Sequence, residues 1–573
     1  MRLHSTFGLH KPALLLLLIL AGCNSGNQDT RPVTTAPAAS TAQEAVTRPL
    51  PVPQYSAALD GQLKAYDEAT RLSTNPQVKI ENQYNKANAL QRAGRPAEAI
   101  AVYEGIVKSW GDTTEPNLKR FVISAKMSIA QQYRVLNRPD DAYAAFEAAV
   151  VSAGSGKDDL YKNHIATSRL FQGEVLIDQR KFTEAAILLR QSIADHCTST
   201  DQRRINTCAR SRRHLAWALQ QRGLLDDALA MLNEVIAQHG RGTTAELRLE
   251  TTIAHARKGL LFTEQLKRPN DAIEAYGEAV KTGMLANTAE ARAWSALALV
   301  NRGVALSNQG RRQEAIDSYD LAMLYFDSYN EAGLVNPLGR ALLNKAALLQ
   351  ALGRPAEALP VYQAVLRKAG QARPGPQLDL VGQAQIGSGR VLLRLQRFDE
   401  AIATFDSAIN QLGNSPRTEL REIAAQAASA KASAYRLQQG RMDVMKALGN
   451  VEAELQAERA KPEPDRSRGV ASKQLLRATT YMVLGMLDEA ITAFDGVDAD
   501  FGTSQDSMVR GFAARALQGK ALAQQSQGKN TEAGATMRHL IERHKDMREG
   551  TTPQVVREAE QWLRAHPQHE PVG

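Results

Sequence analysis

Small and apolar residues recur along this chain in a pattern that repeats every 43 to 45 residues. In the copy around Ala315, Gly303 precedes the Ala by twelve residues, Leu306 by nine, and Tyr319 follows it by four. Spacings of three, four and twelve residues place such side chains on one face of each of two helices. The recurring anchor residues are Ala99, Ala142, Ala185, Ala228, Ala272, Ala315, Ala358, Ala401, Met445 in a degenerate copy, Ala490 and Ala533.

Most copies also contain glycine or proline at the turn between the two helices. Glycine ends a helix readily in the left-handed conformation, and proline is favoured at the first position of the next helix. We expect the second helix to begin at Pro96, Pro139, Pro269 and Pro355. We expect the first helix to stop at Gly94, Gly223, Gly310, Gly353, Gly440, Gly485 and Gly528. Residues 445–461 depart most from the pattern, which predicts a kink or an irregular repeat there.

The register of small, small and aromatic residues resembles the tetratricopeptide repeat over nearly the whole chain from residue 82 to residue 537. The standard unit has about 34 residues, so the extra residues here should lengthen the first helix. The resemblance implies an all-α, right-handed superhelical solenoid of about eleven helix–turn–helix repeats over residues 80–545. Capping helices are expected at 56–79 and 546–573, and an aromatic share of only 5% suits such an array.

The start of the chain predicts export. Arg2 and Lys11 precede a short apolar run at 13–20, which is too short to span a bilayer. The run ends in Leu20, Ala21, Gly22 and Cys23, which is similar to the lipobox of bacterial lipoproteins. That resemblance implies a signal peptide at 1–22, acylation of Cys23, and a disordered tether at 23–55. With Asn24 after the cysteine, it implies an outer-membrane anchor facing the periplasm; the alternative is an ordinary signal peptide with an incidental cysteine.

Only Cys197 and Cys208 remain once Cys23 is acylated. Export reaches a compartment that permits disulfides, and the two cysteines are close in sequence, so we favour a disulfide between two repeats. The alternative is two unpaired thiols. A metal site is less favoured, because His196 alone cannot complete a tetrahedral ligand set.

The sequence contains no motif that predicts catalysis. It has no HExxH, nucleophile elbow, phosphate loop or CxxC, and its 11 histidines have no metal-ligand spacing. We therefore expect no enzyme, cofactor or metal. The net charge of +9 over 573 residues is a mild excess without a nucleic-acid-binding motif, so nucleic acid is not an expected partner.

The tetratricopeptide resemblance implies that the first helix of each hairpin lines a concave groove. By register, this groove contains Tyr84, Asn88, Gln91, Gln131, Arg134, Arg210, Arg213, Trp217, Gln220, Arg340, Asn344, Arg390 and Arg394. Arginine forks suit carboxylates and Trp217 offers a stacking surface, which favours an acidic peptide or a polysaccharide. The competing interpretation is solvated arginines and a packed tryptophan. Asn85, Asn301 and Asn344 share a register that could clamp a peptide, but Ser128, Phe171, His214 and Gly387 interrupt it.

The leading functional hypothesis is a membrane-anchored periplasmic scaffold for proteins of an envelope assembly, secretion or cell-wall complex. Long helical arrays offer large binding surfaces without chemistry, which suits this role. One alternative is a glycan-associated lipoprotein of an exopolysaccharide secretion system. A second alternative is a structural spacer.

Overall fold

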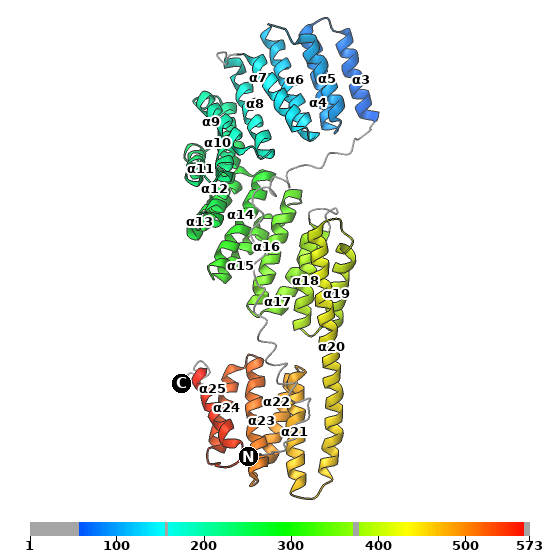
Figure 1. Cartoon of the computed structure of the whole chain (residues 1–573), viewed down its shortest axis with the longest axis vertical. Helices are drawn as coiled ribbons and strands as arrows, with labels where there is room; N and C mark the ends of the chain where they lie inside the picture. Colours follow the sequence, from blue (N-terminus) through cyan, green and yellow to red (C-terminus); the bar gives the residue numbers. More distant parts are fainter. Residues whose placement is uncertain (1–56, 155–158, 371–376, 567–573) are drawn as a thin grey trace, which may run out of the picture. The chain divides into compact units, whose positions relative to one another are not determined.

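The computed structural model describes residues 57–154, 159–370 and 377–566, which fold into helices without any β-strand (Figure 1). These residues form two compact units. The larger unit contains the described residues up to 391 together with 410–424, and the smaller unit contains 392–409 and the described residues from 425 onward. The predicted signal peptide, Cys23 and the tether lie outside the described residues.

The larger unit is a series of hairpins, each with a first and a second helix joined by a tight turn. A preceding helix, α3, spans Ala57–Leu72. The hairpins are α4 (Pro76–Arg92) with α5 (Pro96–Trp110), α6 (Pro116–Val135) with α7 (Pro139–Ala153), α8 (Asp159–Asp178) with α9 (Phe182–His196), α10 (Gln202–Gln221) with α11 (Leu225–His239), α12 (Ala245–Glu264) with α13 (Pro269–Ala286), α14 (Ala289–Asn308) with α15 (Arg312–Phe326), and α16 (Ala332–Ala351) with α17 (Pro355–Gly370). All four predicted prolines begin a second helix.

The remaining helices continue this order into the smaller unit. They are α18 (Leu378–Arg394), α19 (Phe398–Leu412), α20 (Thr418–Arg459), α21 (Asp465–Val483), α22 (Leu487–Phe501), α23 (Ser507–Ser526), α24 (Asn530–His544) and α25 (Thr552–Ala565). Most first helices contain 20 residues and most second helices 15, as α14 and α15 do. The extra residues of the 43-residue period therefore lengthen the first helix, as predicted.

A left-handed residue ends the first helix at the same position, five residues before the anchor, in ten turns of the described residues. Glycine occupies this position at Gly94, Gly223, Gly310, Gly353, Gly485 and Gly528. Four turns use another residue instead: Asn137, Arg180, Lys267 and Gln396, with φ between 54° and 59°. The glycine pattern missed these four turns, because the packing of the two helices enforces the left-handed conformation even without glycine.

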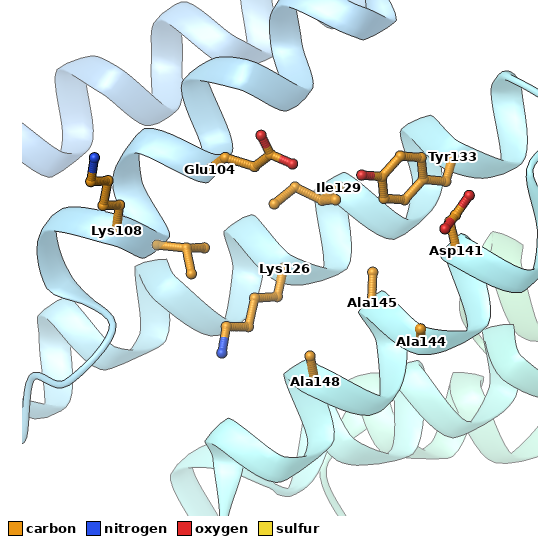
Figure 2. A pocket seen from close by; sticks show the side chains of 10 residues that line it. Glu104, Lys108, Lys126, Ile129, Tyr133, Asp141, Ala144, Ala145 and Ala148 are labelled. Carbon is orange, nitrogen blue, oxygen red and sulfur yellow. The ribbon is translucent and has the colours of Figure 1, made fainter.

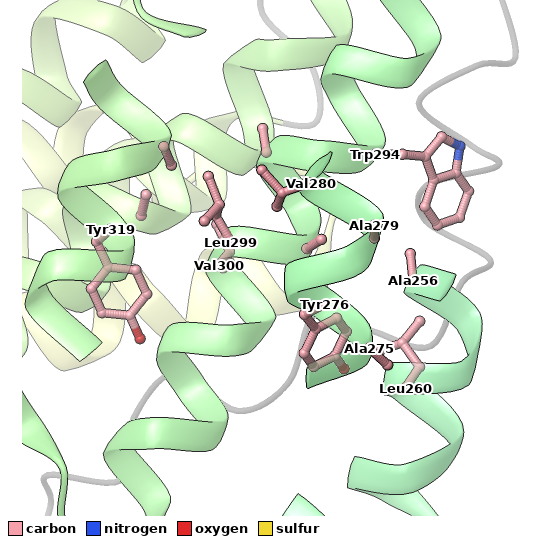
Figure 3. Packing of buried hydrophobic residues seen from close by; sticks show 14 of the residues in the cluster. Ala256, Leu260, Ala275, Tyr276, Ala279, Val280, Trp294, Leu299, Val300 and Tyr319 are labelled. Carbon is pink, nitrogen blue, oxygen red and sulfur yellow. The ribbon is translucent and has the colours of Figure 1, made fainter. Parts of the chain in front are cut away.

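The core of each hairpin is a small residue on the first helix covered by a large residue on the second. Tyr276 and Tyr319 have almost no exposed surface (Figure 3). Their rings lie against Gly259 and Gly303. A Cβ atom on Gly259 would lie 2.5 Å from the ring of Tyr276, so this site has no room for a side chain. The close approach of the two helices therefore depends on the small residue of the sequence pattern.

The prediction that Gly440 ends a helix is wrong. Gly440 lies inside α20, which continues for 42 residues, so the ninth copy is one long helix rather than a hairpin or a kink. The ninth copy has Met445 at the anchor and Gly449 where other copies carry an aromatic residue. Without the small anchor and the large covering side chain, a hairpin has too little core to offset the break in the helix.

The last helix covers the end of the array. Val555, Val556 and Ala559 of α25 join a buried cluster with α23 and α24, which closes the hydrophobic face of the final hairpin. In the part of the chain that the structure describes, no helix combines the length and the hydropathy that a membrane span needs.

Candidate functional site

First helices of successive hairpins pack against each other in the larger unit, and one row of side chains follows their contacts. Its members lie two residues before the small packing residue: Asn85, Ser128, Phe171, His214, Arg257, Asn301, Asn344 and Gly387. Arg257 is the only arginine or lysine in this row; the other members are three asparagines, a serine, a histidine, a phenylalanine and a glycine. The middle of the row, between α6 and α14, contains most of the buried charge.

Glu174 of α8 is the centre of a buried ion cluster. Its Oε2 accepts a hydrogen bond of 3.0 Å from Nη1 of Arg134, and its Oε1 lies 2.7 Å from Nη2 of Arg210 and 3.1 Å from Nε2 of His214. Burial alone would raise the pKa of Glu174, but His214, Arg210 and Arg134 outweigh it and hold the pKa well below its usual range. Two of the predicted groove arginines therefore neutralise a carboxylate of their own chain.

A buried ion pair also joins α10 to α12, the first helices of the fourth and fifth hairpins. Nε of Arg213 on α10 donates a hydrogen bond of 2.5 Å to Oε2 of Glu250 on α12, and the two side chains are 10% and 11% exposed. The geometry satisfies both charges within the chain. Arg213 is therefore a structural residue of the joint between the two hairpins rather than a free fork for a ligand.

Arg257 of α12 differs from these arginines because it forms no ion pair with any described residue. Its guanidinium lies over the ring of Trp217 at 4.8 Å and over the ring of Trp294 at 5.8 Å, between α10 and α14. The residue is 3% exposed, and its Nε and Nη1 are buried without a hydrogen-bond partner within the described residues. We call Arg257, Trp217 and Trp294 the Arg257 site; Figure 3 shows Trp294 projecting beside Ala256.

The electrostatics of this site favour an anionic ligand. Burial and the charge of Arg213 outweigh the opposing charge of Glu250 and lower the pKa of Arg257 to about 9, so the side chain remains a cation at neutral pH. A buried cation without a counter-ion costs several kcal/mol, of which two ring contacts return about 1–3 kcal/mol. An oxyanion that reached the guanidinium would remove the remaining cost.

The other predicted groove residues lie apart from this centre. Tyr84 packs against Tyr103 and Phe121, and Asn88 accepts a hydrogen bond of 2.7 Å from the hydroxyl of Tyr103. Nε of Arg340 donates to Oδ1 of Asn336 at 2.8 Å. Gln220 and Asn344 are buried, Gln131 is half-buried, and Gln91, Arg390 and Arg394 are exposed.

Sequence reasoning missed Glu174, Glu250, Arg257 and Trp294. The signal for Arg257 was present, since it lies two residues before Gly259, as Asn301 lies two residues before Gly303. One additional residue between Gly259 and its anchor shifts this register when positions are counted back from Ala272. The carboxylates give no such signal, because an acid on a first helix has the same pattern whether it is buried or solvated.

A disulfide also joins two of these hairpins. Cys197, after α9, and Cys208, in α10, form a disulfide with their Cα atoms 5.6 Å apart, which joins the third hairpin to the fourth. Within the described ranges, no group of three or more histidine, cysteine, aspartate or glutamate side chains could hold a metal ion.

Sequence comparison identifies the repeat. Three segments match family models described as tetratricopeptide repeat, at residues 84–157, 209–234 and 338–412. The chain is a tetratricopeptide repeat protein. The matched segments include hairpins of the larger unit on both sides of the Arg257 site, and such repeats indicate a scaffold for protein–protein interaction. No curated protein matches the sequence.

Several solved structures match parts of the chain. A tetratricopeptide repeat protein from Parabacteroides merdae has 13% identity and a TM-score of 0.32, covering 53% of this chain and 98% of its own. The apo form of RapI has 10% identity and a TM-score of 0.41, covering 62% and 98%. The apo quorum sensor NprR from B. thuringiensis has 14% identity and a TM-score of 0.33, covering 65% and 97%.

Proposed function

We propose that this tetratricopeptide repeat protein is an exported, lipid-anchored scaffold that binds an acidic segment of another cell-envelope protein at the Arg257 site. The observation that carries the proposal is the buried guanidinium of Arg257, which has no counter-ion within the described residues. Neighbouring arginines on the same face are already paired with Glu174 and Glu250. An external carboxylate would therefore stabilise Arg257 more than it would stabilise these paired arginines.

An acidic peptide suits this site better than a polysaccharide. A neutral sugar stacks on an open aromatic face, but the guanidinium of Arg257 lies over both tryptophan rings. A carboxylate would instead meet the guanidinium while its methylene groups contact the rings. Side chains of an extended peptide could then follow the row of first helices in both directions, as tetratricopeptide scaffolds allow.

The site is tested with a fluorescent acidic peptide and the mature chain. Arg257→Met removes the charge but keeps the apolar stem, and should weaken peptide affinity at least about tenfold. The matched control is Arg312→Met, which removes an exposed arginine at the start of α15 and should leave affinity unchanged. Equal affinity of Arg257→Met and the unmodified chain, or equal binding of an amidated, uncharged peptide, would rule out the acidic ligand.

The proposed location rests on Leu20, Ala21, Gly22 and Cys23. Cys23→Ala should abolish incorporation of labelled palmitate and move the protein from the membrane fraction to the soluble fraction. Partners can then be recovered from membranes in mild detergent and identified by mass spectrometry. A Cys23→Ala protein that remains in the membrane fraction would contradict the lipid anchor.

A further inference from the structure

His164 lies in the larger unit on the first helix of the third hairpin, near the N-terminal end of α8. This helix packs against both α6 and α10. Nε2 of His164 lies 3.4 Å from Oγ of Ser124 on α6, and the residue is half-buried. Its Nδ1 is buried and has no hydrogen-bond partner within the described residues. The chain therefore engages one ring nitrogen of His164 and leaves the other without a partner.

Two arginines from the neighbouring first helices face this imidazole. Arg120 precedes Ser124 by one turn, which places both on the same face of α6, and Arg203 lies in the first turn of α10. Burial lowers the pKa of His164, and the charges of Arg120 and Arg203 lower it further. Three side chains that can carry positive charge, from three successive hairpins, therefore lie together.

Neither arginine has a counter-ion among the described residues. Arg120 and Arg203 are exposed, and neither forms an ion pair there. An acid of the same joint, Asp201, is the N-cap of α10, and its Oδ1 accepts a hydrogen bond of 3.0 Å from the backbone N–H of Arg204. This carboxylate serves the end of the helix. Both guanidinium groups are therefore accessible to a ligand.

The helix α6 also borders a groove with a different charge balance. This groove lies between α5, α6 and α7 and encloses about 460 Å³ (Figure 2). Lys108 and Lys126 line it. Glu104 and Asp141 line it as well, so charges of both signs are present and neither sign of ligand is selected. In contrast, the only charges that shift the pKa of His164 are positive.

We infer that Arg120, His164 and Arg203 form a binding site for a phosphate group. A phosphate group carries nearly two negative charges at neutral pH and offers three oxygens that accept strong hydrogen bonds. Two guanidinium groups match this charge and bind phosphate oxygens in a fixed fork geometry. The bound dianion also favours the imidazolium form of His164, in which Nδ1 carries a proton and donates to the ligand. A carboxylate has fewer oxygens and less charge, and would satisfy fewer of these donors.

The disulfide contributes to the geometry of this site. Cys197 and Cys208 join the end of α9 to α10, and Cys208 follows Arg203 by five residues. The first turns of α10 are thus held against the preceding hairpin. A site that is already formed in the free protein loses less conformational entropy when the ligand binds.

The probes are inorganic phosphate and a water-soluble, short-chain phosphatidic acid, because a phosphate group comes either from a small molecule or from a lipid headgroup. NMR of isotope-labelled histidine in the mature chain follows the titration of His164, whose signal is assigned with His164→Gln. Saturating phosphate should raise the pKa of His164 by at least about 1. Arg203→Gln should weaken phosphate binding at least about tenfold in titration calorimetry. The matched control is Arg222→Gln, at the exposed C-terminal end of the same helix, which should leave phosphate affinity unchanged.

Tighter binding of the lipid or of inorganic phosphate supports the site in either case and identifies the source of the phosphate group. Arg203→Gln should bind the acidic peptide of the Arg257 site with unchanged affinity, so failure here is distinguishable from failure of the proposed function. Circular dichroism and thermal unfolding verify that the variants fold. The inference is overturned if neither probe raises the pKa of His164, or if Arg203→Gln binds phosphate as tightly as the unmodified chain.

Discussion

At the scale of single residues, two arginines on neighbouring helices have opposite roles although their sequence patterns are alike. Arg213 is held by Glu250, whereas Arg257 lies over two aromatic rings and forms no ion pair within the described residues. The buried pair depends on both partners, since removing one leaves the other charge buried and uncompensated. An unpaired buried cation instead lowers the stability of the free protein, which is consistent with a site kept for a ligand.

This contrast predicts opposite effects on folding. Arg213→Met should lower the free energy of unfolding by about 3–5 kcal/mol, because Glu250 is then buried without a counter-ion. Arg257→Met should leave stability unchanged or raise it, because it removes an uncompensated charge and retains apolar contact with Trp217 and Trp294. Urea unfolding of both variants measures this difference. A large loss of stability in Arg257→Met would show that Arg257 has a structural partner, contrary to the proposed binding role.

At the scale of elements, the turn residue and the core decide together whether a repeat folds as a hairpin. Gln396 adopts the left-handed conformation without being glycine, whereas Gly440 occupies the same register and stays helical. In the ninth copy the missing core contacts at Met445 and Gly449 outweigh a favourable turn residue. Local propensity is therefore a weaker determinant of these turns than the packing of the two helices.

Two glycines of the smaller unit test this conclusion. A Cβ atom would meet no other atom within 4 Å at either Gly440 or Gly528, and only Gly528 has a positive φ, of 79°. Gly440→Ala should therefore stabilise α20 by about 0.5–1 kcal/mol, since alanine loses less conformational entropy in a helix. Gly528→Ala should destabilise the α23–α24 turn by about 1–2 kcal/mol. Hydrogen exchange of the two segments reports each effect locally, and a loss of protection at α20 in Gly440→Ala would contradict the continuous helix.

At the scale of the whole molecule, buried histidines occur in both units. Burial lowers the pKa to about 4 for His214, where Arg213 adds to the effect, for His255, and for His544, where Arg510 and Arg543 add to it. Unfolded histidine titrates near 6.5. Between these two values the unfolded chain takes up protons that the folded chain does not, so acid favours unfolding.

Stability should therefore be complete above about pH 6.5 and fall as the pH is lowered toward 4, by up to about 1.4 kcal/mol per pH unit for each fully buried histidine. Urea midpoints measured between pH 7.5 and 4.5, chosen to span the range from about 6.5 to about 4, test this directly. His214→Gln should make the dependence shallower for the larger unit. A midpoint that does not change with pH in this range would contradict the burial of these groups.

The amino-acid sequence by itself determines the period, the helical hairpins and most of the turns of this protein. Each hairpin is built from contacts within about 20 residues, so a small residue, its anchor and an aromatic residue specify it locally. The same pattern placed the longer first helices and the second-helix prolines. It also pointed to the first helices as the place of the buried charges, through Arg210, Arg213 and Trp217.

Only the tertiary structure decided which of those charges are satisfied. Arg134 meets Glu174, Arg213 meets Glu250, and Trp217 meets Arg257 across successive hairpins, at separations of 37 to 40 residues. A solvated arginine, a paired arginine and an unpaired buried arginine have the same sequence pattern, because burial comes from the neighbouring hairpin. For the same reason, the loss of core contacts at Met445, and not the glycine at 440, decided that the ninth repeat stays a single helix.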